Sequence, residues 1–228
     1  MRKNIQKYKG FSFIELLLTL MILMVVMLLV ATTLTTISRV SVTTSNKNLA
    51  RNDINYIMDT FQRTISNANI DEIYLFDSSQ STVEFVSGQI SLNDSTNGGQ
   101  YEVEQALGEY GNEIQVKLYG YDYWVCLGFF RDVNNYGYLF RTYNRKDNLR
   151  EDHSKCFDED AVITLLHSYS INIDEFDIQY VDMGESINSM FLINATVEPL
   201  MWPVSDTFPV NKYVSRQSVI STEALTVY

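Results

Sequence analysis

The sequence predicts an α+β fold in which a long N-terminal α-helix, first transmembrane and then amphipathic, packs on an antiparallel β-sheet. Three observations lead to this prediction. Residues 11–34 form one apolar run, residues 46–69 carry an apolar stripe at helical spacing, and the rest of the chain reads as strands separated by turn residues. A single helix followed by consecutive strands is an α+β arrangement, not an alternation of helices and strands.

The size and composition of the chain fit one domain and an anchor. Of its 228 residues, 46% are hydrophobic and 13% are aromatic, which is enough to bury a core. The formal net charge is -11. Non-specific binding of nucleic acid needs a cationic surface, so this charge argues against nucleic acid as the main partner.

The apolar run at residues 11–34 has the length of a membrane span, because as a helix it would measure about 36 Å. One charge, Glu15, interrupts it. The positive-inside rule places the N-terminal leader in the cytoplasm and everything after about residue 35 outside. The leader has this orientation because it holds four cations: Arg2, Lys3, Lys7 and Lys9.

Three interpretations of this segment compete. A secretory signal peptide has an apolar region of about 7–15 residues and a small-x-small cleavage site, whereas this run is longer and ends in VATTLTT. A plain membrane anchor explains the hydrophobicity but gives no reason for Glu15, since a carboxylate in the membrane costs about 2.5–3.5 kcal/mol. The third interpretation accounts for the leader, the carboxylate and the apolar run together.

That interpretation rests on a resemblance. The string Gly10-Phe11-Ser12-Phe13-Ile14-Glu15, followed by LLLTLMIL, resembles the class III signal of type IV pilins and pseudopilins. The resemblance implies that a prepilin peptidase cuts after Gly10 on the cytoplasmic side. It also implies that the new N-terminal residue, Phe11, is N-methylated and that Glu15 pairs with the N-terminal amine of a neighbouring subunit.

The physical chemistry of these positions agrees with the roles that the resemblance implies. Gly10 has no side chain, so the bond after it can enter a tight protease site. Cleavage creates a positive α-amine on Phe11. Two opposite charges in an apolar helix bundle attract strongly and either one alone is costly, so Glu15 would set the register between subunits.

The helix is expected to continue beyond the membrane. An apolar stripe follows it: Ala50, Ile54, Ile57, Met58, Phe61, Ile65 and Ala68. No proline occurs before Pro199, so none breaks this helix. The chain is therefore divided into a cleaved leader, a transmembrane assembly helix, a helix extension and an extracellular β-rich domain, at residues 1–10, 11–34, 35–70 and 71–228.

Strands are expected in three groups. Residues 72–77 and 82–87 are predicted to pair, residues 121–130 and 136–143 to form a hairpin with 113–119 nearby, and residues 174–183 and 188–198 to form another pair. The stretches 88–112 and 144–160 are expected to be surface loops. A short apolar-polar segment ends the chain at residues 214–227.

Cys126 and Cys156 are the two cysteines of the chain. Neither lies in a C-x-x-C pair or at metal-ligand spacing from a histidine, which argues against zinc. Outside the cytoplasm a disulfide is the natural interpretation, and two unrelated buried thiols are the alternative.

No motif in the sequence indicates catalysis, so we expect no enzyme, cofactor or metal. The histidines, His153 and His167, have no nucleophile at a defensible spacing. The run Asp158–Asp160 is either part of a calcium site or, as we favour, a solvated acidic loop.

A basic stretch with interleaved tyrosines is either a hairpin with two faces, as we favour, or a contact for single-stranded DNA. Its residues are Arg131, Arg141, Arg145, Lys146, Arg150, Tyr136, Tyr138 and Tyr143.

The resemblance implies a structural subunit of a type IV pilus or related filament, serving adhesion, motility, secretion or DNA uptake. Its partners would be prepilin peptidase, other pilin subunits and the assembly machinery in the membrane. The large aromatic-rich domain favours a minor pilin, and the tail Ser215–Ser221 is similar to J-type pseudopilins. The chain would cross the membrane once, with its C-terminus outside, and then enter an extracellular filament. The alternatives are an anchored extracellular binding module that never assembles, or a tip adhesin using loops 88–112 and 144–160.

Overall fold

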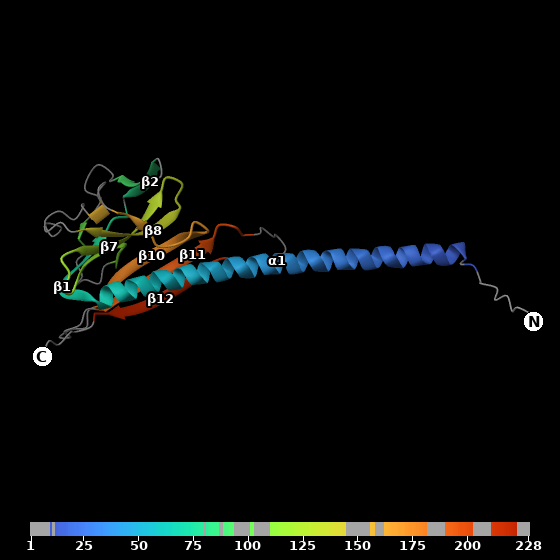
Figure 1. Ribbon diagram of the computed structural model, residues 1–228, viewed down its shortest axis with the longest axis horizontal. Coiled ribbons are helices and arrows are strands. Elements are labelled where there is room, and N and C mark those ends of the chain that lie inside the picture. Colours follow the sequence, from blue (N-terminus) through green and yellow to red (C-terminus); the bar gives the residue numbers. More distant parts are fainter. Residues whose placement is uncertain are drawn as a thin grey trace, which may run out of the picture. The chain divides into compact units, whose positions relative to one another are not determined.

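The computed structural model contains two compact units, Met1–Ser45 and Asn46–Tyr228. A single long helix and twelve strands make up its regular structure in the part described here, and Figure 1 shows their arrangement. The residues whose structure is described are 10, 12–79, 81–86, 89–93, 101–102, 110–144, 156–157, 162–181, 190–202 and 211–222.

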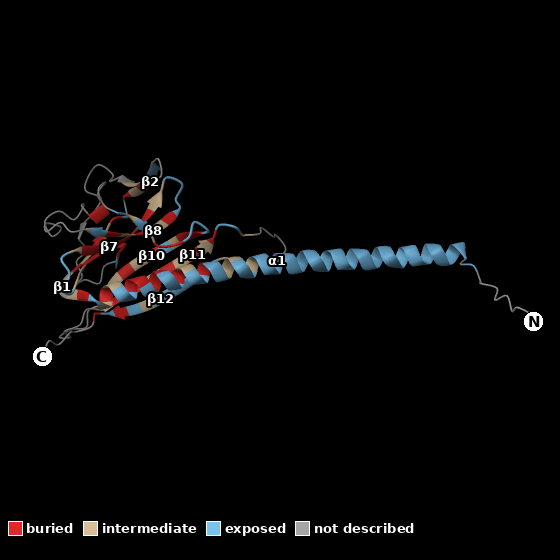
Figure 2. Ribbon diagram, in the orientation of Figure 1, coloured by how far each residue is buried: buried red, intermediate tan, exposed pale blue. Residues whose placement is uncertain are grey.

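Helix α1 spans Phe13–Ser66, and its two parts belong to different units. In the first unit its apolar side chains are exposed, whereas in the second unit it carries a buried stripe (Figure 2). The helix ends where Asn67 forms a turn, and the side-chain amide of Asn67 donates to the carbonyl of Arg63 at 2.7 Å. This bond satisfies a carbonyl that has no partner within the helix.

Eight strands of the second unit form one sheet, in the order β3-β2-β7-β6-β1-β4, with β8 and β9 continuing from β7. All its strand pairs are antiparallel except β2 with β7, which is parallel. Its strands are β1 Ala68–Asp77, β2 Thr82–Val86, β3 Gln89–Asn93, β4 Tyr101–Glu102, β6 Glu113–Leu118, β7 Trp124–Asp132, β8 Gly137–Asn144 and β9 Thr164–Leu165.

Four strands form a second, fully antiparallel sheet in the order β12-β11-β10-β5. In β11 buried and half-buried residues alternate strictly, as expected of a strand with one face on the core. In Figure 1, β10, β11 and β12 lie beside the last part of α1. These strands are β5 Tyr110–Gly111, β10 Ile171–Val181, β11 Met190–Pro199 and β12 Val214–Ser221.

The main core is built where the helix stripe meets one face of each sheet. The ring of Phe176, on β10, lies 5.3 Å from that of Phe61 on the helix and 5.8 Å from that of Phe129 on β7. One side chain thus joins the helix to both sheets. A second cluster covers the other face of the larger sheet and includes Trp124, Phe140 and both cysteines.

The α+β prediction is confirmed, since a long N-terminal apolar helix packs against antiparallel sheets through the stripe predicted for it. Ala68, the last stripe residue, belongs to β1 and not to the helix. The predicted hairpin is present as β7 and β8, and the last predicted pair as β10 and β11. Two sheets form instead of one.

The first predicted strand pair is wrong. β1 pairs with β6 and β4, while β2 pairs with β3 and β7. The expected loop at 88–112 contains β3, β4 and β5. The polar composition of that stretch concealed its strands, although Ser87-Gly88, between β2 and β3, is a dipeptide typical of a tight turn. Of the expected loop at 144–160, only Asn144, Cys156 and Phe157 are among the described residues.

Candidate functional site

The predicted cleavage position begins the described part of the chain. Gly10 is exposed, and a Cβ added to it would meet no atom within 4 Å. The described part of the chain therefore gives no steric reason for a glycine at this position. Phe11 and the four leader cations, Arg2, Lys3, Lys7 and Lys9, lie outside the described residues.

Glu15 takes part in the N-terminal cap of helix α1. The backbone N–H of Ser12 donates to Oε2 of Glu15 at 3.0 Å, and Oγ of Ser12 accepts the N–H of Ile14 at 3.2 Å. The carbonyl of Ser12 accepts the first helical bond, from Leu16, at 3.2 Å. This is a capping box, in which the serine and the glutamate each satisfy a free backbone donor. It directs the carboxylate back toward the start of the helix.

The capping role of Ser12 was not predicted from the sequence. The signal was available, because Ser12-Phe13-Ile14-Glu15 has the S-x-x-E spacing that precedes many helices. Glu15 thus has a local hydrogen bond in addition to its expected role as a partner of other chains. The two roles are compatible, since a carboxylate has acceptor sites for several donors.

The helix surface after Glu15 is apolar on every side. An 18-residue window of α1 has a mean hydropathy of 2.9, and none of it is buried within the chain. Exposed apolar surface on this scale marks contact with lipid or with other proteins. The hydroxyl groups of the threonines that follow donate hydrogen bonds to backbone carbonyls of the same helix. Thr32 and Thr33, for example, donate to the carbonyl of Leu29 at 2.9 and 2.8 Å. These bonds satisfy polar groups without water.

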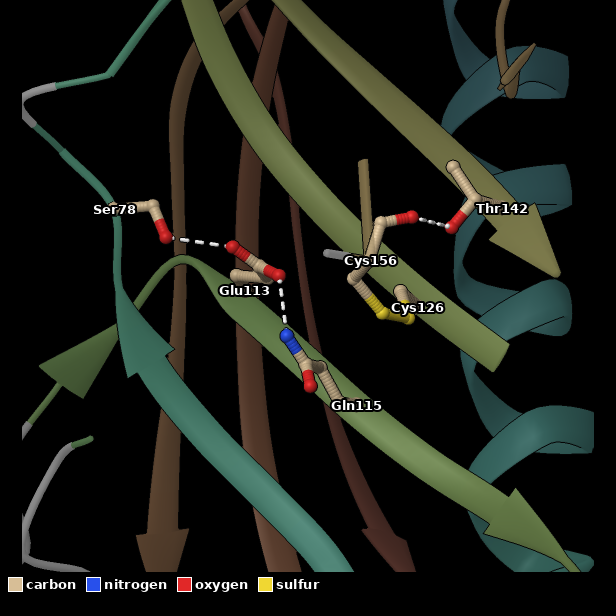
Figure 3. The surroundings of a disulfide bond; sticks show 6 residues. All are labelled: Ser78, Glu113, Gln115, Cys126, Thr142 and Cys156. Carbon is tan, nitrogen blue, oxygen red and sulfur yellow. Dashed lines mark hydrogen bonds between the residues drawn. A yellow bond between two sulfur atoms is a disulfide. The ribbon is translucent and has the colours of Figure 1, made fainter. Parts of the chain in front are cut away.

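Cys126 and Cys156 form a disulfide in the structure, with their Cα atoms 6.1 Å apart (Figure 3). Cys126 belongs to β7, and the carbonyl of Cys156 accepts the hydroxyl proton of Thr142, on β8, at 2.6 Å. Both cysteines are buried in the second cluster. The bond therefore fastens a distant segment to the outer face of the larger sheet.

A buried polar group lies beside this disulfide (Figure 3). The carboxylate of Glu113, 1% exposed, accepts bonds from Oγ of Ser78 at 2.6 Å and Nε2 of Gln115 at 2.9 Å. Hydrogen bonds of this kind offset the cost of burying a carboxylate. The alternation in residues 113–118 resembles that of a half-exposed strand, but both faces of this strand are covered.

Of the remaining cationic candidates, the structure describes Arg131 and Arg141, which lie against different aromatic rings. Arg131 places its guanidinium 5.2 Å from the ring of Phe129, and Arg141 lies 5.1 Å from that of Tyr143. Among the described residues, no three His, Cys, Asp or Glu side chains form a group that could hold a metal. Outside the described residues lie Arg145, Lys146, Arg150, His153 and Asp158–Asp160.

His167 is buried at the edge of the larger sheet and is 8% exposed. Its Nε2 accepts the N–H of Leu139 at 3.3 Å, and its Nδ1 lies 2.9 Å from the carbonyl of Ser168, to which it donates. These two bonds require the neutral ring. Burial lowers the pKa of His167 from its ordinary value of 6.5, against smaller opposing contributions from the Ser168 carbonyl and Asp53.

Comparison with known proteins supports the interpretation of the N-terminus. The family described as the prokaryotic N-terminal methylation motif matches residues 5–31. The chain carries a class III prepilin signal. This signal is typical of type IV pilins and pseudopilins, which are generally structural subunits and not enzymes. No curated protein and no solved structure matches the chain.

Proposed function

We propose that this pilin-like chain is a subunit of a type IV pilus or related filament, and specifically a minor pilin. Prepilin peptidase cleaves it after Gly10, Phe11 is then N-methylated, and residues 11–34 enter the filament core. The observation that carries this proposal is the methylation motif at residues 5–31, which includes the start of a helix whose apolar window is not buried by any described residue of the chain.

The surroundings of that helix change during the proposed pathway. Before assembly, lipid covers residues 11–34, and the leader stays in the cytoplasm. After assembly, the same side chains pack against neighbouring subunits in an extracellular filament. The helix extends beyond the membrane to Ser66, and the strands that follow it, from Ala68, belong to the extracellular domain. The partners are prepilin peptidase, other subunits and the membrane assembly machinery.

Glu15 recruits the neighbouring subunit in this proposal. The capping box already directs its carboxylate toward the N-terminal end of the helix. There the carboxylate can form an ion pair with the positive α-amine of an adjacent chain. Each charge then offsets the cost of burying the other in an apolar surrounding. The assignment as a minor pilin is based on the large size of the extracellular domain and on the aromatic content of the chain, which is 13%.

The mass of the mature N-terminus tests the pathway. The protein is purified from cells with and without their prepilin peptidase, and its N-terminal peptide is measured by mass spectrometry. We expect a chain beginning at N-methylated Phe11 only when the peptidase is present. A chain that keeps Met1 in both strains, or one cut near residue 35, would leave an anchored or secreted domain and rule out filament assembly by this route.

A further inference from the structure

A group of aromatic side chains at one end of the larger sheet has no part in the proposed assembly. Its centre is Tyr138 on β8, whose ring lies 5.0 Å from that of Phe85 on β2 and 6.0 Å from that of His167. The Phe85 ring meets Tyr138 edge-on, and the His167 ring stacks on it. Two further tyrosines lie next to these residues in the chain and complete what we call the Tyr138 cluster: Tyr136, whose carbonyl accepts the N–H of Asp132 at 2.9 Å two residues before Tyr138, and Tyr169, two residues after His167.

Three members of the cluster are open to solvent. Phe85 and Tyr136 are each 42% exposed, and Tyr169 is 69% exposed. Single exposed aromatic residues are common on proteins and need no explanation. These three come from separate segments, namely β2, the β7–β8 turn and the turn before β10. Exposed aromatic surface that gathers from distant segments indicates a binding site.

The backbone holds these segments in place. β2 runs parallel to the end of β7, with Val83 opposite Asp132, so Phe85 follows beside the β7–β8 turn. Oδ1 of Asp132 accepts the N–H groups of Asn134 and Tyr136 at 2.9 and 2.8 Å. These bonds fix the turn that presents Tyr136. The cluster is therefore formed before any ligand arrives.

The charge within the cluster is negative. Asp132 is the carboxylate of this cluster, and the pKa of Tyr138 is raised by burial first and then by the charges of Asp132 and of the phenols of Tyr169 and Tyr136. His167 is neutral, because its Nε2 accepts a hydrogen bond from a backbone N–H. The ring faces of the tyrosines add the negative part of their quadrupoles.

The adjacent cation does not offset this charge at the ring faces. Arg131 precedes Asp132 in β7, and neighbouring residues of a strand point to opposite faces of the sheet. Its guanidinium donates to the carbonyl of Asn135 at 3.0 Å and to that of Asp174 on β10. These contacts hold Arg131 on the side of the sheet that carries Phe129.

We propose that the Tyr138 cluster binds an organic cation, and a quaternary ammonium group in preference to a primary ammonium group. Aromatic ring faces attract cations, and a carboxylate beside them strengthens the attraction. A primary ammonium is strongly hydrated and gives up more water on such a surface than a methylated one. The net charge of -11 for the whole chain also favours a cationic ligand over an anionic one.

Choline and its uncharged carbon isostere, 3,3-dimethylbutan-1-ol, distinguish a cation site from an apolar surface. Each is added to the full-length protein in nanodiscs at constant ionic strength, and saturation transfer to its methyl groups is measured by NMR. We expect saturable transfer to choline in roughly the millimolar range, because the rings are open to solvent. Transfer to the isostere should be weaker by about fivefold. Equal transfer to both compounds would overturn the proposal.

Variants locate the site. Tyr169→Leu removes an exposed ring, and Asp132→Asn removes the charge while keeping an oxygen that accepts the turn hydrogen bonds. Both should reduce the choline signal severalfold while circular dichroism stays unchanged. The matched control is Tyr121→Leu, which alters another exposed tyrosine that pairs with Tyr123 at 5.2 Å. If Tyr121→Leu reduces binding as much as Tyr169→Leu does, the cluster is not the site. Filament assembly does not enter this experiment, so its result is independent of the proposed function.

Discussion

The two parts of helix α1 have the same backbone conformation and opposite surroundings. In residues 13–30 the apolar side chains are exposed on all sides, while in residues 46–66 they form one buried stripe. The later part is amphipathic and is stabilised by its own domain. The earlier part has no such core, so its stability depends on lipid or on neighbouring chains. One continuous helix is therefore stabilised in two different ways.

The largest expected effect comes from truncating a phenylalanine to alanine in each part of the helix. Phe61→Ala removes a ring with 0% exposure that contacts Phe176, so the second unit should lose about 3–5 kcal/mol of unfolding free energy. Phe13→Ala is the matched control, since Phe13 is 78% exposed. Its effect on the unfolding of the domain, followed by denaturant titration in detergent, should be near zero. Similar losses for both variants would show that the two parts share one stabilising core.

The second prediction concerns a constraint that only the domain has. Cys126→Ala combined with Cys156→Ala removes the disulfide, which closes 30 residues, and should cost the domain about 3–4 kcal/mol. The loss arises mainly because the unfolded chain gains freedom. A reductant should lower the denaturation midpoint of the wild type by a similar amount and leave the double variant unaffected. An unchanged midpoint in the double variant would mean that the second cluster holds its position without the bond.

The same contrast explains what the sequence could and could not predict. The helix stripe and the β7–β8 and β10–β11 pairs were predictable because their apolar spacing is local. The pairing of β1 with β4 and β6, and that of β2 with β7, were not, because strand pairing across the chain leaves no local signal. Burial of Glu113 escaped prediction for the same reason. Its cover comes from segments that are distant in sequence.

The N-terminal motif, by contrast, is local in sequence. Gly10, Phe11 and Glu15 were predicted from their order alone, because the methylation motif is a short linear segment. The capping box of Ser12 is also local and was predictable in principle. The Tyr138 cluster was not, since Phe85, Tyr136 and Tyr169 come together only through the fold. The sequence favoured a two-faced hairpin for Tyr136 and Tyr138, with a contact for single-stranded DNA as the alternative. Arg131 donates to the carbonyl of Asp174, and Arg141 lies against the ring of Tyr143.

A third prediction uses pH to test the stability of the domain that holds the later part of the helix. The folded domain lowers the pKa of His167 below its ordinary 6.5, so the unfolded chain binds more protons as the pH falls past 6.5. Stability should be full above about pH 7 and decrease as the pH falls from 6.5 toward the folded pKa, by at most about 1.4 kcal/mol per pH unit. His167→Gln should flatten this dependence, as measured by denaturant titration at several pH values. A slope that survives the substitution would assign the effect to other groups.

The smallest effect is expected at the start of the helix, where no domain contributes. Ser12→Ala removes the hydroxyl that accepts the N–H of Ile14, and loss of a serine cap costs about 1 kcal/mol. Ser12→Thr keeps the hydroxyl and is the matched control. Amide hydrogen exchange of Ile14 in micelles should be faster in Ser12→Ala by about fivefold and close to wild type in Ser12→Thr. Exchange in residues 46–66 should not change in either variant, because that part of the helix is held by the core around Phe61. Faster exchange there would show that the cap stabilises the whole helix and that its two parts are not independent.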